Sequence, residues 1–311
     1  MTTPGIVVSG VRRAFGQVQA VRDVSLEAAT GKVTGLVGPN GSGKTTLLLM
    51  LASLLAPDAG EIRLDGIDPV TEPQRARALL GWMPDSLGAW NALTARETLT
   101  VTGRLYDLPK EAARARAEVL LREVGLTALA DSPARVLSRG QKQRLGLARA
   151  LVHDPRILLL DEPASGLDPQ ARVELRVLLR RLADDGRTIL ISSHILSELE
   201  EVVDDAVFLF QGATVSTERV AEAAQRGRTW RLRLHSTAAL DDQRAQVGAA
   251  LSIQPHQIGA DRRDLLVAFA SDDDAVSALR ALVTAGVPVA EFSAATGTLE
   301  HTFLDLGGGA A

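Results

Sequence analysis

Apolar positions near the start of the chain recur at the spacing of β-strands. β-branched residues alternate with polar ones on both sides of a Phe15-Gly16 turn, which predicts an antiparallel pair. A glycine-rich loop then precedes an apolar helical run, Thr45–Ala56, that Pro57 ends. The strands predicted in this part of the chain are 6–8, 18–28, 32–37 and 61–64.

Residues 94–153 carry a long helical pattern rich in Ala, Arg, Leu and Glu, punctuated by Pro109 and Pro133. Beyond it, fully apolar runs alternate with amphipathic ones. A continuous apolar run is typical of a strand buried on both faces of a parallel sheet. The pattern therefore predicts an α/β domain with a mainly parallel sheet. The expected strands are 156–160, 187–192 and 206–210, and the expected helices are 171–183 and 197–203.

The pattern changes near residues 221–227, where we place a domain boundary. Trp230, Leu232 and Leu234 then alternate with polar residues, as in a half-buried strand. We expect one domain over residues 1–222, with a helical subdomain over about 86–155, and a small α+β domain over residues 223–311. The later elements expected are helices 238–250, 274–285 and 299–306 and strands 264–268 and 287–292.

Composition narrows the range of functions. The 311 residues are 46% hydrophobic and carry a formal net charge of −4. The chain therefore lacks the excess of basic residues that would indicate nucleic acid as its main partner. The chain has no cysteine, which excludes disulfides and thiolate metal sites. The most apolar windows, 47–56 and 157–160, are shorter than the roughly 20 residues of a spanning helix. We expect a soluble chain.

One loop carries the strongest chemical signal. It fits the pattern G-x-x-x-x-G-K-[ST] between a strand and a helix, in which backbone N–H groups and a helix N-terminus wrap a phosphate. Lys44 is expected to reach the β- and γ-phosphates, and the Thr45 hydroxyl to bind Mg²⁺. The expected nucleotide-binding residues are Gly38, Pro39, Asn40, Gly41, Ser42, Gly43, Lys44, Thr45 and Thr46.

Two acids end a buried strand downstream of that loop. Strands often end in acids, but here Asp161 and Glu162 fall at the carboxyl edge of the sheet, where the phosphate loop also opens. We expect Asp161 to hold Mg²⁺ through water and Glu162 to take a proton from the attacking water.

The segment Leu137-Ser138-Arg139-Gly140-Gln141 and the helix after it resemble the signature motif of the ATPase subunits of ABC transporters. The family's usual form has Gly where this chain has Arg139. The resemblance covers about residues 5–222 and implies a P-loop NTPase core that binds ATP and Mg²⁺. It also implies that Ser138, Arg139, Gly140 and Gln141 contact nucleotide.

Further segments match the family in order. Residues 164–168 resemble its D-loop, which implies a place for Asp168 at the nucleotide, and His194 resembles a histidine that contacts the γ-phosphate. Phe15 stands where the family keeps an aromatic residue that stacks on adenine. Asp85 departs from the pattern, because the family commonly has Gln there. We expect Asp85 to keep the role of that Gln in catalysis, beside the Mg²⁺ ion and the attacking water.

The C-terminal domain is similar to the extra domain on ATPases of the drug-resistance-exporter (daunorubicin-resistance) type, by position and by the closing segment 299–304. The resemblance implies that two copies pair head to tail and enclose ATP between them. A separately encoded membrane permease would be the second partner, and the chain would lie on the cytoplasmic face of the membrane. We expect the permease to dock near residues 85–93, with Leu87 and Trp90 exposed.

Two other functions fit parts of the sequence. A soluble ATPase of the same family acting on ribosomes or DNA is possible, but such proteins usually carry two sets of motifs or long coiled coils, and this chain has one set and no heptad insertion. A small GTPase would need an Asn-Lys-x-Asp motif, which the chain lacks. A transport ATPase is the favoured interpretation.

Overall fold

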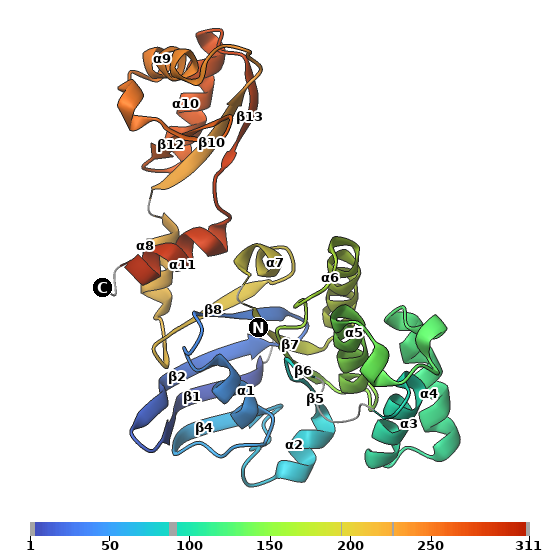
Figure 1. Ribbon diagram of the computed structural model, residues 1–311. Helices are drawn as coiled ribbons and strands as arrows, with labels where there is room; N and C mark the ends of the chain where they lie inside the picture. Colours follow the sequence, from blue (N-terminus) through green and yellow to red (C-terminus); the bar gives the residue numbers. More distant parts are fainter. Residues whose placement is uncertain (1–3, 87–91, 194, 226, 309–311) are drawn as a thin grey trace. The chain divides into compact units, whose positions relative to one another are not determined.

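The computed structural model describes residues 4–86, 92–193, 195–225 and 227–308. It divides into two compact units, unit 1 (Met1–Val215) and unit 2 (Ser216–Ala311), labelled by element in Figure 1. The expected boundary after residue 222 falls inside a helix, α8 (Thr217–Gln225), which the sequence pattern did not indicate. This helix is short and begins without a glycine or proline to mark it.

Unit 1 is built on a nine-stranded sheet in the order β4-β1-β2-β9-β8-β3-β7-β6-β5. Its edge β4-β1-β2 is antiparallel, whereas β8, β3, β7, β6 and β5 run parallel to one another. The predicted α/β class with an antiparallel N-terminal part is confirmed. The strands are β1 (Pro4–Phe15), β2 (Val18–Ala29), β3 (Val33–Val37), β4 (Ala59–Leu64), β5 (Leu80–Met83), β6 (Ile157–Asp161), β7 (Thr188–Ser193), β8 (Asp205–Phe210) and β9 (Ala213–Thr214).

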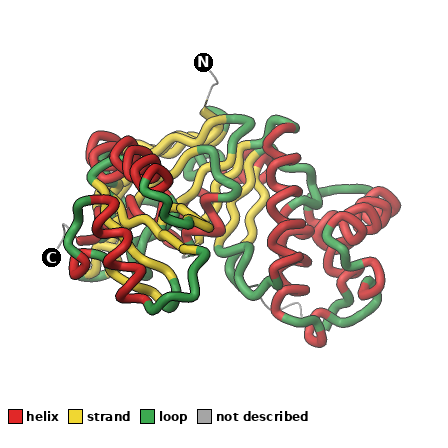
Figure 2. The backbone as a smooth tube through the Cα atoms, turned by 90° about the horizontal axis from the view of Figure 1, so that it is seen from above, coloured by secondary structure: helices red, strands yellow, loops and turns green. Residues whose placement is uncertain are grey.

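The helices of the long helical segment form a group of their own beside the sheet (Figure 1, Figure 2). Among the described residues, every helix is too short or too polar to span a bilayer. Thr94 starts α3 with a capping box, because its hydroxyl accepts from the Glu97 N–H while the Glu97 carboxylate accepts from the Thr94 N–H. The helices of unit 1 are α1 (Lys44–Leu51), α2 (Pro73–Leu79), α3 (Ala95–Leu105), α4 (Lys110–Glu123), α5 (Arg139–Ala150), α6 (Pro169–Asp184) and α7 (Leu196–Glu200).

Helix α1 is shorter than its apolar run predicts. It ends at Leu51, whereas the expected end was Ala56. Ser53 has a φ of 57°, in the left-handed region that a helix cannot continue through, and its hydroxyl donates to the Pro69 carbonyl at 2.7 Å. This contact from outside the helix fixes the early turn, and such a contact is not visible in a local pattern.

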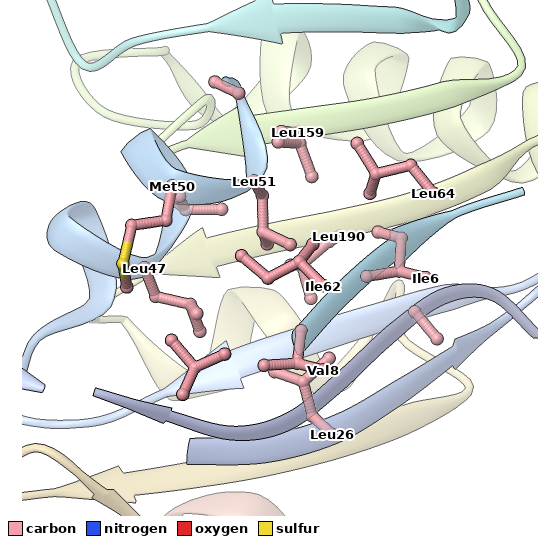
Figure 3. Packing of buried hydrophobic residues seen from close by; sticks show 14 of the residues in the cluster. Ile6, Val8, Leu26, Leu47, Met50, Leu51, Ile62, Leu64, Leu159 and Leu190 are labelled. Carbon is pink, nitrogen blue, oxygen red and sulfur yellow. The ribbon is translucent and has the colours of Figure 1, made fainter. Parts of the chain in front are cut away.

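The core of unit 1 lies where α1 packs between the two parts of the sheet. Leu47, Met50 and Leu51 point from α1 toward β1, β2 and β4 and toward Leu159 of β6 and Leu190 of β7 (Figure 3). All five side chains are fully buried. Burying each contributes about 1.5–3 kcal/mol relative to exposure. The packing fixes the start of α1, and with it the glycine-rich loop, against the carboxyl ends of the parallel strands.

Unit 2 has a β-α-β-β-α-β order with an antiparallel sheet in the order β11-β12-β10-β13, which is the ferredoxin-like arrangement. Leu232 and Leu234 of β10 face the buried cluster of this unit, as their alternation predicts. Strand β11 was not predicted, because its three residues are all exposed. The elements are α8, β10 (Arg228–Leu234), α9 (Leu240–Leu251), β11 (Gly259–Asp261), β12 (Asp264–Phe269), α10 (Asp272–Thr284), β13 (Val289–Ala294) and α11 (Thr298–Gly308).

A half-buried histidine joins the helical segment to the sheet in unit 1. The Nε2 atom of His153, just after α5, lies 3.1 Å from the Leu80 carbonyl of β5, and its ring stacks on Tyr106 at 3.7 Å between centroids. Burial lowers the pKa of His153 to about 4. The imidazole is therefore neutral in the folded protein near neutral pH, with its proton on Nε2, so that it donates to the carbonyl.

His153 should make unit 1 less stable in mild acid. Because its pKa is about 4 when folded and near 6.5 when unfolded, the unfolded chain binds more protons between these values, and the free energy of unfolding falls as pH drops through that window. Urea unfolding at pH 7.5 and pH 4.5 should show a smaller acid loss for His153→Gln than for the wild type. The exposed His256 provides the control, since His256→Gln should leave the acid loss unchanged. Equal losses in all three proteins would contradict this assignment.

Candidate functional site

The glycine-rich loop joins the buried central strand β3 to α1. A side chain at Gly38 would lie 2.3 Å from the Leu209 carbonyl oxygen, and Gly43 combines a φ of 101° with a position 2.5 Å from the Ala20 carbonyl oxygen. Only glycine fits at these two positions, since a Cβ would clash with backbone and a positive φ strains other residues. The chain therefore turns tightly enough to begin α1 at Lys44.

Lys44 is held over this loop. Its Nζ donates to the carbonyls of Gly38 at 2.7 Å and Pro39 at 3.1 Å, and the residue is only 8% exposed. Burial lowers the pKa of the Lys44 ammonium, while Glu162 and Asp161 oppose the shift by favouring the charged form. A cation so placed beside backbone N–H groups is suited to a bound phosphate.

Asp161 links three elements at the carboxyl edge of the sheet. This carboxylate, 3% exposed at the end of β6, accepts from Thr45 Oγ1 of α1 at 3.1 Å and from Ser192 Oγ of β7 at 2.5 Å. The sequence placed Thr45 and Asp161 at the same predicted Mg²⁺ ion, and the structure brings their side chains into contact. It did not indicate Ser192, because a serine inside an apolar strand has no local signature.

These oxygens fit a magnesium ion. A hydroxyl and a carboxylate are ligands that Mg²⁺ accepts, and this ion usually takes one or two carboxylates and completes its shell with phosphate and water. Among the described residues, no three acids or histidines converge as a self-contained metal site. Thr45 and Asp161 offer two oxygen donors in contact with each other.

Glu162 has a backbone conformation that its neighbours impose. Its φ is 52°, which is uncommon for a residue with a side chain. Its N–H donates to Ser192, to the carbonyl at 3.2 Å and to Oγ at 3.1 Å, and its carbonyl accepts from Gln143 Nε2 at 3.4 Å. Such strain persists only where the surroundings over-determine it, and it gathers at functional sites.

Gln143 connects this turn to the segment that carries Asp85. The nearly buried amide of Gln143, on α5, donates to the carbonyls of Asp85 at 3.3 Å and Glu162 at 3.4 Å. The role of Gln143 could not be predicted, because one glutamine on an amphipathic helix carries no signal of its own. The Asp85 side chain is exposed, and Ser86 is the last residue described before residues 87–91. Leu87 and Trp90, the expected permease contacts, lie outside the described residues.

One cavity collects most of these groups. Its volume is about 500 Å³, within the range of small-molecule sites. The hairpin between β1 and β2 forms one wall. The lining residues are Val18, Gln19, Ala20, Asn40, Gly41, Gly43, Lys44, Thr45, Thr46, Asp85, Arg139, Asp161, Glu162 and Ser165.

Several predicted residues lie outside this lining. Phe15 ends β1 with its side chain 47% exposed, and Arg13 lies over its ring at 4.9 Å from the centroid. Asp168 caps α6 by accepting from the Ala171 N–H at 2.9 Å. Both are near loops that border the cavity, and their expected nucleotide contacts stay predictions. His194 lies outside the described residues.

The signature segment starts α5. The Ser138 hydroxyl accepts from the Gln141 N–H at 3.2 Å, and the Gln141 side chain accepts from the Ser138 N–H at 2.8 Å. This capping box leaves the N-terminus of α5 ordered and Ser138 exposed. Of the four expected nucleotide contacts in this segment, only Arg139 lines the cavity of its own chain.

Known proteins share this arrangement. The ABC transporter family matches residues 21–165. The chain is 33% identical to the daunorubicin resistance ATP-binding protein DrrA3 of Streptomyces coeruleorubidus, over 99% of this chain and 97% of that protein. It is 38% identical to the Nod factor export ATP-binding protein I of Ralstonia nicotianae, over 69% of this chain and 67% of that protein. A dimeric ATP-binding cassette solved in a post-hydrolysis state with ADP and Pi has a TM-score of 0.63 at 27% identity, covering 68% of this chain and 97% of that one.

Ser192 should matter for ATP turnover although it does not line the cavity. Ser192→Ala removes the hydroxyl that orients Asp161 and accepts from the Glu162 N–H. Loss of such a supporting contact typically lowers activity about 10–100-fold. Phosphate release should therefore fall by that order, whereas Ser25→Ala, which removes a hydroxyl on β2 that accepts from the Gly10 N–H, should keep the wild-type rate. A wild-type rate in Ser192→Ala would show that Asp161 does not need this bond.

Proposed function

This chain belongs to the ATP-binding subunits of ABC transporters and is an ATPase of that family, and we propose that it drives an export permease as one half of a head-to-tail pair. The observation that carries this proposal is the convergence of Lys44, Thr45, Asp161 and Glu162 on one cavity at the sheet edge. A phosphate loop alone would fit many nucleotide-binding proteins. A phosphate loop joined to a signature helix and a D-loop fits this family.

ATP would lie in the cavity with its phosphates on the loop. The loop N–H groups and the start of α1 surround the β-phosphate, and Lys44 reaches the β- and γ-phosphates. Thr45 and Asp161 would hold Mg²⁺, which neutralises charge on the phosphates. The hairpin beside the cavity would border the base, with Phe15 as its expected stacking partner.

Hydrolysis would proceed by attack of a water on the γ-phosphate, which breaks the bond to the oxygen of the β-phosphate and releases ADP. Glu162 accepts the proton of that water, and the bonds from Ser192 and Gln143 to its backbone keep its carboxylate aimed into the cavity. Asp85 would lie beside the Mg²⁺ ion and orient the water, and His194 would contact the γ-phosphate. The protein contributes mainly position and charge, as is usual for phosphoryl transfer.

A second copy would complete the site. Ser138 is exposed at the start of a capped helix and does not line the cavity of its own chain. Its hydroxyl accepts from the Gln141 N–H, so the hydroxyl hydrogen would be the part that meets the nucleotide of a partner. Ser138, Gly140 and Gln141 of one chain would then cover the ATP bound by the other, with Asp168 near the contact. The similarity to a dimeric cassette supports this pairing.

Export is supported by the extent of the similarity. The match to a daunorubicin resistance protein includes unit 2 as well as unit 1. A drug-like, lipid or polysaccharide substrate would pass through a separately encoded permease, on which the chain would sit at the cytoplasmic face of the membrane. Closure of two chains on ATP and reopening after hydrolysis would move that permease.

Replacing the proposed base should separate binding from hydrolysis. Glu162→Gln keeps the size of the side chain but cannot take a proton, so it should bind ATP and release phosphate about 10²–10⁴-fold more slowly than the wild type. It should also accumulate as a pair of chains with ATP, which light scattering can detect. Glu61→Gln, on β4 away from the cavity, is the matched control and should behave as the wild type. Undiminished turnover in Glu162→Gln would remove Glu162 as the base.

A further inference from the structure

Arg139 occupies an unexpected place. The family resemblance puts this residue against the nucleotide of the partner chain, and the usual glycine there has no side chain to reach elsewhere. In this structure the Arg139 side chain lines the cavity of its own chain, together with Lys44, Thr45 and Glu162.

Two residues of the loop after β6 hold Arg139 in that position. Its Nη2 donates to Ser165 Oγ at 2.5 Å. Its aliphatic stem covers Gly166, where a Cβ would lie 2.7 Å from Arg139 Cδ and where φ is 74°. A larger residue at 166 would both strain the backbone and displace the arginine. The turn therefore leaves the space that the Arg139 stem fills.

The unused donors of Arg139 favour an anionic ligand. The cavity lining carries two cations, Lys44 and Arg139, and three carboxylates, Asp85, Asp161 and Glu162, whose excess charge a Mg²⁺ ion arriving with ATP would offset. No carboxylate among the described residues pairs with Arg139. A guanidinium has five N–H donors, and the bond to Ser165 uses one of them. The remaining donors form a planar fork suited to phosphate oxygens.

We propose that Arg139 binds the terminal phosphate of the ATP held by its own chain. The proposal rests on the proposed function, because it requires ATP in this cavity. Arg139 and Lys44 would then contact that phosphate from α5 and from α1. ADP lacks the terminal phosphate, so Arg139 would make a single chain prefer ATP before it meets a partner.

The test compares nucleotides in unpaired chains. Binding of ADP and of a non-hydrolysable ATP analogue, both with Mg²⁺, is measured by calorimetry at protein concentrations where light scattering shows single chains. Hydrogen bonds to charged groups contribute about 1.5–3 kcal/mol, equivalent to roughly a 10–150-fold change in affinity. Arg139→Ala should weaken binding of the analogue by that factor and leave binding of ADP unchanged. Arg139→Lys, which keeps the charge without the fork, should fall between.

Two further variants complete the design. Ser165→Ala removes only the anchor and should weaken analogue binding less than Arg139→Ala does. Arg135→Ala, an exposed arginine in the turn before α5, should bind both nucleotides as the wild type does.

The outcomes separate the two proposals. Wild-type chains that bind neither nucleotide would overturn the proposed function itself. Wild-type chains that bind ATP and ADP, with Arg139→Ala and Arg139→Lys matching them for both, would overturn the role of Arg139 while leaving the proposed function intact. A loss that appears only once chains pair would also overturn it, because the arginine would then act on the partner's nucleotide.

Discussion

Two hydrogen bonds to one buried carboxylate connect the parts of the candidate site. Asp161 accepts from Thr45 at the start of α1 and from Ser192 at the end of β7. A charge this deep in the protein is costly unless it is hydrogen-bonded, so the positions of α1, β6 and β7 depend on one another through it. The core beneath α1 holds the same three elements by apolar packing. The phosphate loop and the acids are therefore held together at one edge of the sheet.

The signature segment at the start of α5 is linked to that edge through Gln143 of the same helix. Gln143 donates to the backbone carbonyls of Asp85 and Glu162, the two acids that would face the water. The start of the same helix carries Ser138 and Arg139. A shift of α5 on contact with a second chain would act on Glu162 through this amide. Its neighbours already hold Glu162 in a strained conformation, and a small displacement there changes the aim of its carboxylate.

The sequence predicted the parts of the site that follow strict rules of spacing. The loop before Lys44 and the acids at the end of β6 line one cavity, as the shared edge of parallel strands predicts, and their roles at a nucleotide stay predictions. It did not predict Ser192 and Gln143, whose roles depend on partners far along the chain. It missed α8, whose residues were taken as the boundary between domains, and β11, whose three residues are all exposed. It made α1 too long because Ser53 is fixed by Pro69. Arg139 can line the cavity of its own chain because Gly166 leaves space for its side chain, and only the tertiary structure reveals that space.

The central claim is that each ATP is enclosed by the phosphate loop of one chain and the Ser138 segment of another. Mixing two inactive variants tests it most directly, one with Lys44→Ala and one with Ser138→Arg. A mixed pair contains one site with both defects and one site with neither. The account predicts that phosphate release by the mixture clearly exceeds the sum of the rates of the separate variants. A mixture no more active than that sum, with mixed pairs shown to form, would contradict a site shared between chains.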